Sequence, residues 1–128
     1  MYEFSDKSKQ RMSGVNSRLQ DVASRAIEIT AIDFGIPKTG GLRSSAVQLA
    51  LYKNGVSKAD GVRHKSKHQD GQALDVFAYV DGKASWEVEH LAQVAAAFMQ
   101  AAIELNVKIK WGGFFKSFTD MPHFEIVE

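Results

Sequence analysis

One segment of this chain has an apolar spacing that is typical of a helix with a single buried face. Between residues 88 and 105 the apolar side chains recur at intervals of three and four residues, the period of an amphipathic α-helix. Ser85 precedes this segment and is the expected N-cap. The apolar face requires a second layer of structure to cover it, so the chain must fold around a core. The residues of this face are Val88, Leu91, Ala95, Phe98, Ala102 and Leu105.

The remaining apolar patterns predict two more helices and three short strands. Helical spacing marks the helices, and short apolar runs between turn residues mark the strands. With 128 residues, the chain is expected to form one α+β domain over residues 1–128, a small and mainly antiparallel sheet packed against helices. The predicted elements are helices at residues 16–32, 46–54 and 88–105 and strands at residues 73–80, 107–111 and 123–127.

The composition excludes several classes of protein. The chain contains no cysteine, so any bound metal must use histidine and carboxylate ligands. The 16 basic and 15 acidic residues give a net charge of +1, which argues against a dedicated nucleic-acid binder. The N-terminal residues lack the apolar core of a secretion signal, and the uncharged stretch at residues 91–103 is too short to cross a bilayer. We expect a monomer made in the cytoplasm, with no nucleic-acid partner and no stable membrane association.

Asp75 is the one carboxylate in the apolar segment at residues 73–80. Burial of an unpaired carboxylate costs several kcal/mol, so this side chain needs a metal ion, a cation or a set of hydrogen-bond donors. The strand alone leaves two interpretations open. Asp75 is either a ligand in a functional site or a strand-end carboxylate held by backbone N–H groups.

Two histidines provide partners for a metal site at Asp75. His68 lies seven residues before Asp75, and Gly71 between them permits a bend that turns His68 back toward the carboxylate. His123 begins the last predicted strand, and Glu125 shares its strand face. Two imidazoles and one carboxylate, with a fourth position left for water, form a ligand set of catalytic zinc sites.

Three short motifs occur in a fixed order along the chain. Residues 66–75 read SKHQDGQALD and fit the pattern S-x-H-x-x-G-x-A-x-D. Residues 120–123 read DMPH, an acid three residues before a histidine, and residues 41–44 read GLRS with Gln48 four residues later. Together these motifs resemble those of the D-alanyl-D-alanine carboxypeptidase-type zinc metallopeptidases. The short chain, residues 4–8 (FSDKS) and the WGG turn at residues 111–113 are most similar to phage endolysins of the L-alanyl-D-glutamate peptidase type.

The resemblance implies a hedgehog/D,D-peptidase-like zinc peptidase fold and a role for each motif residue. It implies one Zn²⁺ ion held by a His-Asp-His set, one acidic general base and one arginine near the scissile carbonyl. Glu125 stays open as an alternative base, or as a residue that orients a metal ligand. The implied residues are the ligands His68, Asp75 and His123, the base Asp120, the catalytic arginine Arg43, and the substrate-binding residues Ser66 and Gln48.

The implied activity is hydrolysis of the L-alanyl-D-glutamate bond in the stem peptide of bacterial peptidoglycan. The enzyme would wait in the host cytoplasm and act on the cell wall, in the periplasm, after its release. Two alternatives stay open. A D-alanyl-D-alanine carboxypeptidase or dipeptidase would use the same metal and base, and a non-catalytic cell-wall-binding zinc protein would use the same fold.

Overall fold

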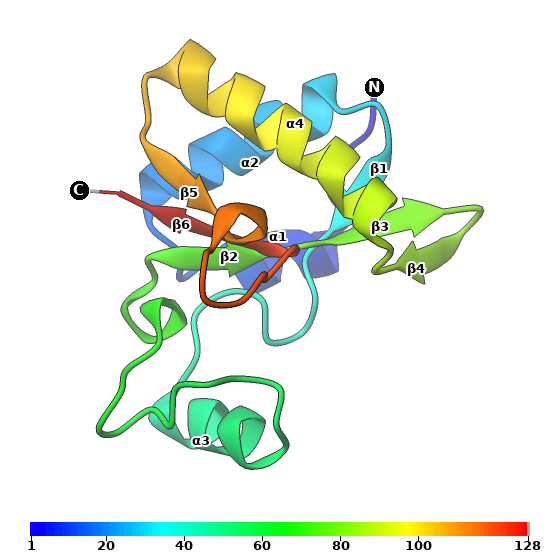
Figure 1. Ribbon diagram of the computed structural model, residues 1–128. Helices are drawn as coiled ribbons and strands as arrows, with labels where there is room; N and C mark the ends of the chain where they lie inside the picture. Colours follow the sequence, from blue (N-terminus) through cyan, green and yellow to red (C-terminus); the bar gives the residue numbers. More distant parts are fainter. Residues whose placement is uncertain (128) are drawn as a thin grey trace.

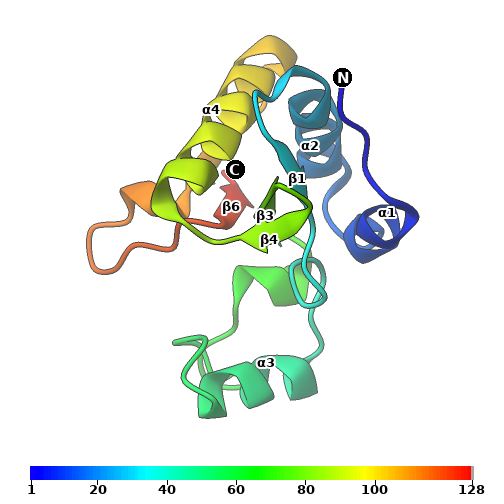
Figure 2. The ribbon, with the colours of Figure 1, turned by 90° about the vertical axis from the view of Figure 1, so that its right-hand side faces the viewer.

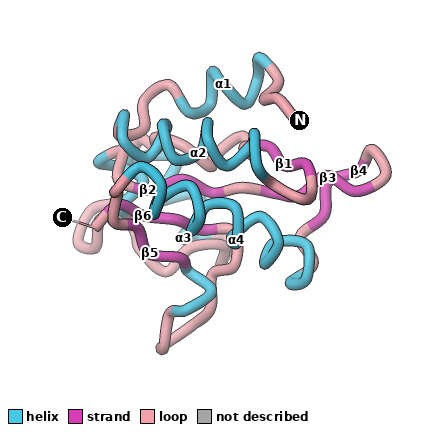
Figure 3. Tube along the Cα trace, turned by 90° about the horizontal axis from the view of Figure 1, so that it is seen from above, coloured by secondary structure: helices cyan, strands magenta, loops and turns pink. Residues whose placement is uncertain are grey.

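A computed structural model describes residues 1–127 and shows two helices packed on the strands. Helix α4 (Val88–Leu105) lies against α2 (Ser17–Ile29), and seen from above both helices cross over the strands (Figure 3). The apolar face of α4 is buried over its middle turns, whereas Val88 and Leu105 at its two ends are exposed. The α+β class predicted from the sequence is confirmed. The buried residues of α4 are Leu91, Val94, Ala95, Ala97, Phe98, Ala101 and Ala102.

The strands form two small sheets in place of the single one that was predicted. Within residues 1–127, one sheet has the strand order β1-β3-β4 and the other has the order β2-β6-β5, and every pair is antiparallel. The two sheets follow one another beneath α4 and α2 (Figure 1). The strands are β1 (Asp33–Gly35), β2 (Ala73–Asp75), β3 (Phe77–Val80), β4 (Lys83–Ser85), β5 (Ile109–Trp111) and β6 (His123–Ile126).

The predicted strand at residues 73–80 is divided at Val76, and its two halves belong to different sheets. β2 pairs with β6, whereas β3 pairs with β1. The N–H of Val76 donates to the carbonyl of Pro122 at 2.9 Å, outside either ladder. The change of partner could not be read from the apolar pattern, because the pattern is continuous across it.

Two predicted helix boundaries are wrong. The first long helix, expected to reach residue 32, ends at Ile29 because Asp33–Gly35 forms the edge strand β1. Ser85 does not cap α4: it ends β4, and Glu87 is the N-cap residue and makes no side-chain capping bond. The hydroxyl of Ser85 instead lies 2.7 Å from Nδ1 of His90.

The sheet β2-β6-β5 has one apolar face and one polar face. Phe124 in β6 is fully buried on the apolar side, and its ring stacks on that of Phe98 with centroids 4.0 Å apart. Residues directly opposite in an antiparallel pair project to the same face. Asp75 is opposite His123, and Lys110 is opposite Glu125, so all four side chains project away from the helices.

The polar face is flanked by a second group of elements on the side away from α2 and α4. Helix α3 (Ser45–Lys53) lies there, separated from α2 and α4 by the strands (Figure 2). The 3₁₀ turn η1 (Lys67–Asp70) leads from this region back into β2. Two further short elements are α1 (Asp6–Met12) and η2 (Gly112–Phe114). In the described part of the chain, no helix is both long and apolar enough to cross a membrane.

Candidate active site

Asp75 and His123 are brought together by the pairing of β2 with β6. They stand directly opposite one another at the end of that ladder. Nδ1 of His123 lies 3.2 Å from Oδ1 of Asp75. Both side chains are largely shielded from water, with 9% of the His123 side chain and 16% of the Asp75 side chain exposed.

His68 reaches the same carboxylate oxygen from the turn η1. Nε2 of His68 lies 3.2 Å from Oδ1 of Asp75. Ser66 caps the turn, and together with Gln69 it forms a reciprocal capping box. Gly71 then takes a left-handed conformation, with φ of 70°, which redirects the chain into β2. The bend expected at Gly71 therefore exists, and it places the histidine where the sequence predicted.

The two histidines are fixed in complementary tautomers. Nδ1 of His68 lies 3.0 Å from the carbonyl oxygen of Gly41, and Nε2 of His123 lies 2.9 Å from Oε1 of Glu125. A carbonyl or carboxylate oxygen can only accept, so these two nitrogens carry the hydrogens. In the neutral rings, the lone pairs of the remaining nitrogens face Asp75. Hydrogen bonds of this kind orient metal-bound histidines in proteins.

This donor set fits a divalent metal ion. One atom from each of His68, Asp75 and His123 lies within 4.8 Å of the other two. Two nitrogen lone pairs and an anionic oxygen that converge in this way repel one another unless a proton or a cation lies between them. In the absence of thiolates, such a nitrogen and oxygen set suits Zn²⁺.

In the metal-free protein, the pKa shifts of Asp75 and His123 show that positive charge stabilises this cluster. Burial opposes ionisation of Asp75, but its contacts with His123 and His68 outweigh burial and hold the Asp75 pKa well below its usual range. Burial also opposes charge on His123, but hydrogen bonds to Asp75 and Glu125 outweigh it and raise the His123 pKa to about 9. A proton on His123 therefore occupies the place that a metal ion would take.

Arg43 binds Oδ2 of Asp75, the carboxylate oxygen that does not face the two histidines. Its Nη2 donates to Oδ2 of Asp75 at 3.0 Å, its Nη1 donates to Oε1 of Gln48 at 3.1 Å, and its Nε donates to the carbonyl of Thr39 at 2.6 Å. Only 9% of the Arg43 side chain is exposed. This geometry supports a positioning role for Arg43, because each of its three nitrogens already has a protein acceptor.

Gln48 lies beneath Arg43 and is fully buried, at 0% exposure. Its amide nitrogen donates to Ser57 Oγ at 2.7 Å and to the carbonyl of Ala59 at 2.8 Å. The amide therefore ties α3 to the loop that follows it and to the guanidinium of Arg43. Gln48 therefore contacts Arg43, and because it is buried its side chain is not accessible to a substrate in this structure.

Asp120 stands beside the three possible metal ligands. Its Oδ2 lies 3.8 Å from Nδ1 of His123, and 39% of its side chain is exposed. Burial and the negative charge of Asp75 raise the Asp120 pKa. Gly112 fixes the position of Asp120: the N–H of Asp120 donates to the Gly112 carbonyl at 2.9 Å, and a Cβ on Gly112 would overlap the Asp120 carbonyl oxygen.

Comparisons with known proteins decide the family. A family model described as phage L-alanyl-D-glutamate peptidase matches residues 1–127. The chain belongs to the phage L-alanyl-D-glutamate peptidase family. Within this family, the L-alanyl-D-glutamate peptidase of Escherichia phage T5 is 36% identical over 112 residues, which are 87% of this chain and 80% of the relative.

Two further peptidases are similar to the chain. The peptidoglycan L-alanyl-D-glutamate endopeptidase CwlK of Bacillus subtilis (strain 168) is 30% identical over 113 residues, covering 80% of this chain and 68% of the relative. The crystal structure of the Serratia marcescens L-Ala D-Glu endopeptidase ChiX superposes with a TM-score of 0.85 and 32% identity, covering 98% of this chain and 90% of that one. Membership in this family makes the chain a peptidase.

Some contacts of the site have no signal in the motifs. The carbonyls of Gly41 and Thr39 orient His68 and Arg43, but a backbone group leaves no trace in a residue pattern. Phe115 lies beside His123, with ring centroids 5.7 Å apart. A second group of possible ligands, Glu87, Glu89 and His90, is mostly exposed at the start of α4. Nδ1 of His90 lies 3.2 Å from Oε2 of Glu87, one turn away on the helix, and the Glu87 side chain is 67% exposed.

Proposed function

We propose that this peptidase is a zinc-dependent endolysin that hydrolyses the L-alanyl-D-glutamate bond of the peptidoglycan stem peptide. One observation carries the proposal. Nε2 of His68, Nδ1 of His123 and Oδ1 of Asp75 converge on one point, with the Asp120 carboxylate beside them. Three ligands and a neighbouring acid are the parts that a hydrolytic zinc site requires.

The ligand roles follow from the orientation of each side chain. His68, Asp75 and His123 would hold the ion, with Gly41 and Glu125 fixing the two rings and Arg43 fixing the carboxylate. A bound Zn²⁺ ion lowers the pKa of water toward ~7 and polarises the scissile carbonyl. Ser66 supports His68 from the turn, because its hydroxyl accepts from the His68 N–H at 3.2 Å.

Asp120 is the general base in this proposal. Its carboxylate takes a proton from the attacking water and passes it to the amine of the leaving D-glutamyl residue as the peptide bond breaks. The raised Asp120 pKa favours this role, because a carboxylate with a higher pKa is a stronger base and takes a proton from water more readily. Glu125 is less suited to it, since its Oε1 already accepts the hydrogen of His123 Nε2.

The bond and the place of action come from the relatives. The phage T5 protein, CwlK and ChiX are all named for cleavage between L-alanine and D-glutamate. The fold of the ChiX structure extends over nearly the whole of this chain. The proposal places the action of this protein on the bacterial cell wall, after synthesis in the host cytoplasm and release from it.

Digestion of purified Gram-negative peptidoglycan, read by mass spectrometry, tests the proposal. The zinc-loaded protein is expected to release peptides that begin with D-glutamate, and a chelator is expected to stop the release. The Asp120→Asn variant, loaded with zinc, is the matched control and should release almost nothing. Loss of terminal D-alanine alone would replace the proposed bond with that of a carboxypeptidase, and binding without cleavage would replace catalysis with a wall-binding role.

A further inference from the structure

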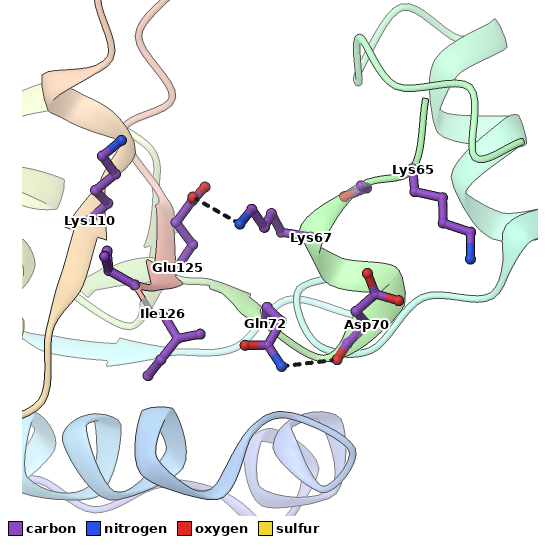
Figure 4. A pocket seen from close by; sticks show the side chains of 9 residues that line it. Lys65, Lys67, Asp70, Gln72, Lys110, Glu125 and Ile126 are labelled. Carbon is purple, nitrogen blue, oxygen red and sulfur yellow. Dashed lines mark hydrogen bonds and ion pairs between the residues drawn. The ribbon is translucent and has the colours of Figure 1, made fainter. Parts of the chain in front are cut away.

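A cavity of about 660 Å³ lies beside the metal-ligand cluster. It opens between the turn η1, strand β5 and strand β6. Three lysines line it, Lys65 and Lys67 from the turn and Lys110 from β5, together with the two acids Asp70 and Glu125 (Figure 4). None of the roles described above uses the three lysines.

Glu125 lines the cavity and also contacts a residue of the metal-ligand cluster. Oε1 of Glu125 lies 2.9 Å from Nε2 of His123, and its Oε2 lies 4.0 Å from Nζ of Lys67. Lys110 is directly opposite Glu125 in the ladder of β5 and β6. Lys110 and Glu125 therefore share the sheet face of His123 and Asp75. A substrate bound at the metal ligands would therefore lie next to this cavity, because Lys110 and Glu125 occupy the adjacent positions on the same face of the sheet.

The charges in the cavity favour an anionic ligand. Glu125 stands between Lys67 and Lys110 (Figure 4), and its carboxylate is already shared with the ring of His123. Lys65 extends away from this group (Figure 4). The Lys67 side chain is 58% exposed, and Lys110 is also exposed, so both ammonium groups can reach a ligand in the cavity.

The chemistry of the proposed substrate identifies that ligand. A D-glutamyl residue has two carboxyl groups, and only one of them can continue the stem peptide. The other is a free carboxylate next to the scissile bond. On the alanyl side, the only carboxyl group is the carbonyl being cleaved and the side chain is a methyl group. A cationic cavity beside the reacting atoms therefore matches the D-glutamyl side.

We propose that Lys67 and Lys110 bind the free carboxylate of the D-glutamyl residue, and thereby set both the direction of the stem peptide and a preference for non-amidated substrates. This inference rests on the proposed function. A carboxylate that reaches both ammonium groups from the cavity gains two charge-assisted contacts. A neutral amide at the same place gains neither.

Two synthetic stem peptides test the inference, one with the free D-glutamyl carboxylate and one with that group converted to a carboxamide. The ratio of their kcat/KM values is measured for the zinc-loaded wild type, the double variant Lys67→Gln/Lys110→Gln, and the control Lys83→Gln. Lys83 is an exposed lysine in β4 of the other sheet, so the control loses one positive charge outside the cavity. Zinc content and the melting temperature are measured on each protein.

The wild type and Lys83→Gln should prefer the carboxylate peptide by about tenfold, the factor expected for two partly exposed ion pairs. The double variant should lose this preference through a higher KM for the carboxylate peptide, with its rate on the amide unchanged. Lys67→Arg/Lys110→Arg should restore the preference. Equal cleavage of both peptides by the wild type would overturn the carboxylate site while leaving the proposed function intact, whereas cleavage of neither would overturn the proposed function itself.

Discussion

Arg43 and Asp75 form an ion pair that is almost completely shielded from water. Nη2 of Arg43 lies 3.0 Å from Oδ2 of Asp75, and only 9% and 16% of the two side chains are exposed. The other oxygen of Asp75 faces both His68 and His123. The carboxylate is thus divided between one oxygen that anchors it and one that is available to a metal ion.

Removal of the anchor should weaken both the metal site and the fold. Arg43→Met is expected to lower zinc affinity 10- to 100-fold, the usual effect of losing a residue that orients a ligand. It should also lower the free energy of unfolding of the metal-free protein by about 3 kcal/mol, because Asp75 is left buried beside one fewer positive charge. Competition with a chromophoric chelator and urea unfolding measure the two effects. Unchanged zinc affinity would show that the ion pair is structural only.

The zinc content of purified variants should distinguish the metal ligands from the general base. Alanine in place of His68, Asp75 or His123 is expected to remove zinc and activity together, since each supplies one converging atom. Zinc should also stabilise the wild type, by about 4 kcal/mol at a free concentration a thousandfold above its dissociation constant. Metal analysis and thermal unfolding with and without a chelator check this. Full activity after exhaustive chelation would remove the metal from the mechanism.

Glycine at position 112 should be required for the placement of Asp120. A methyl group on Gly112 would overlap the Asp120 carbonyl oxygen and push the base away from its place 3.8 Å from His123. Gly112→Ala should therefore lower kcat by about 100-fold, the usual contribution of a general base, while zinc content stays normal. Gly82→Ala controls for backbone strain alone: its φ of 77° strains an alanine, but no atom lies near the added methyl group, so this variant should lose some stability in the β3–β4 turn and keep its kcat. A Gly112→Ala enzyme with wild-type kcat would show that the position of the base is not set there.

Substitution of Glu125 should weaken zinc binding, whereas substitution of Asp120 should abolish turnover. Asp120→Asn is expected to keep zinc and lose activity. Glu125→Gln removes the anionic acceptor of the His123 N–H, so it should weaken zinc binding about tenfold or more and recover most of its rate when zinc is in excess. Zinc titrations of activity distinguish the two variants. If Glu125→Gln abolished turnover at saturating zinc while Asp120→Asn did not, Glu125 would be the base.

The metal-free protein should lose stability at alkaline pH because of His123. Its pKa in the folded state is raised from 6.5 to about 9. A raised histidine pKa stabilises the fold fully below pH 6.5, and the gain is lost as pH rises through about 9. The gain is about 3 kcal/mol, from a shift between those two values. Urea unfolding between these pH values should show the loss in the wild type and not in His123→Gln. A flat wild-type profile would contradict the pairing of His123 with Asp75 and Glu125.

The local patterns in the sequence were sufficient for the elements that have a strong period or a compact motif. The spacing of residues 88–105 predicted α4 because one long amphipathic helix carries its own periodic signal. The segment at residues 66–75 placed His68 near Asp75, since a single glycine bend joins the two. The end of the first long helix and the break at Val76 were not predicted, because three-residue strands such as β1 and β2 are too short to show a period.

The sequence by itself determined the chemistry that this protein can offer: histidine and carboxylate ligands without thiolates, an acid three residues before a histidine, and a core built on one amphipathic helix. Only the tertiary structure decided which nitrogen of each ring faces Asp75, that Arg43 and Gln48 support the site from within, and that Lys67 and Lys110 flank Glu125. The physical reason is that each of these contacts joins segments far apart in the chain. Their partners are fixed by strand register and burial, and neither is encoded in the spacing of neighbouring residues.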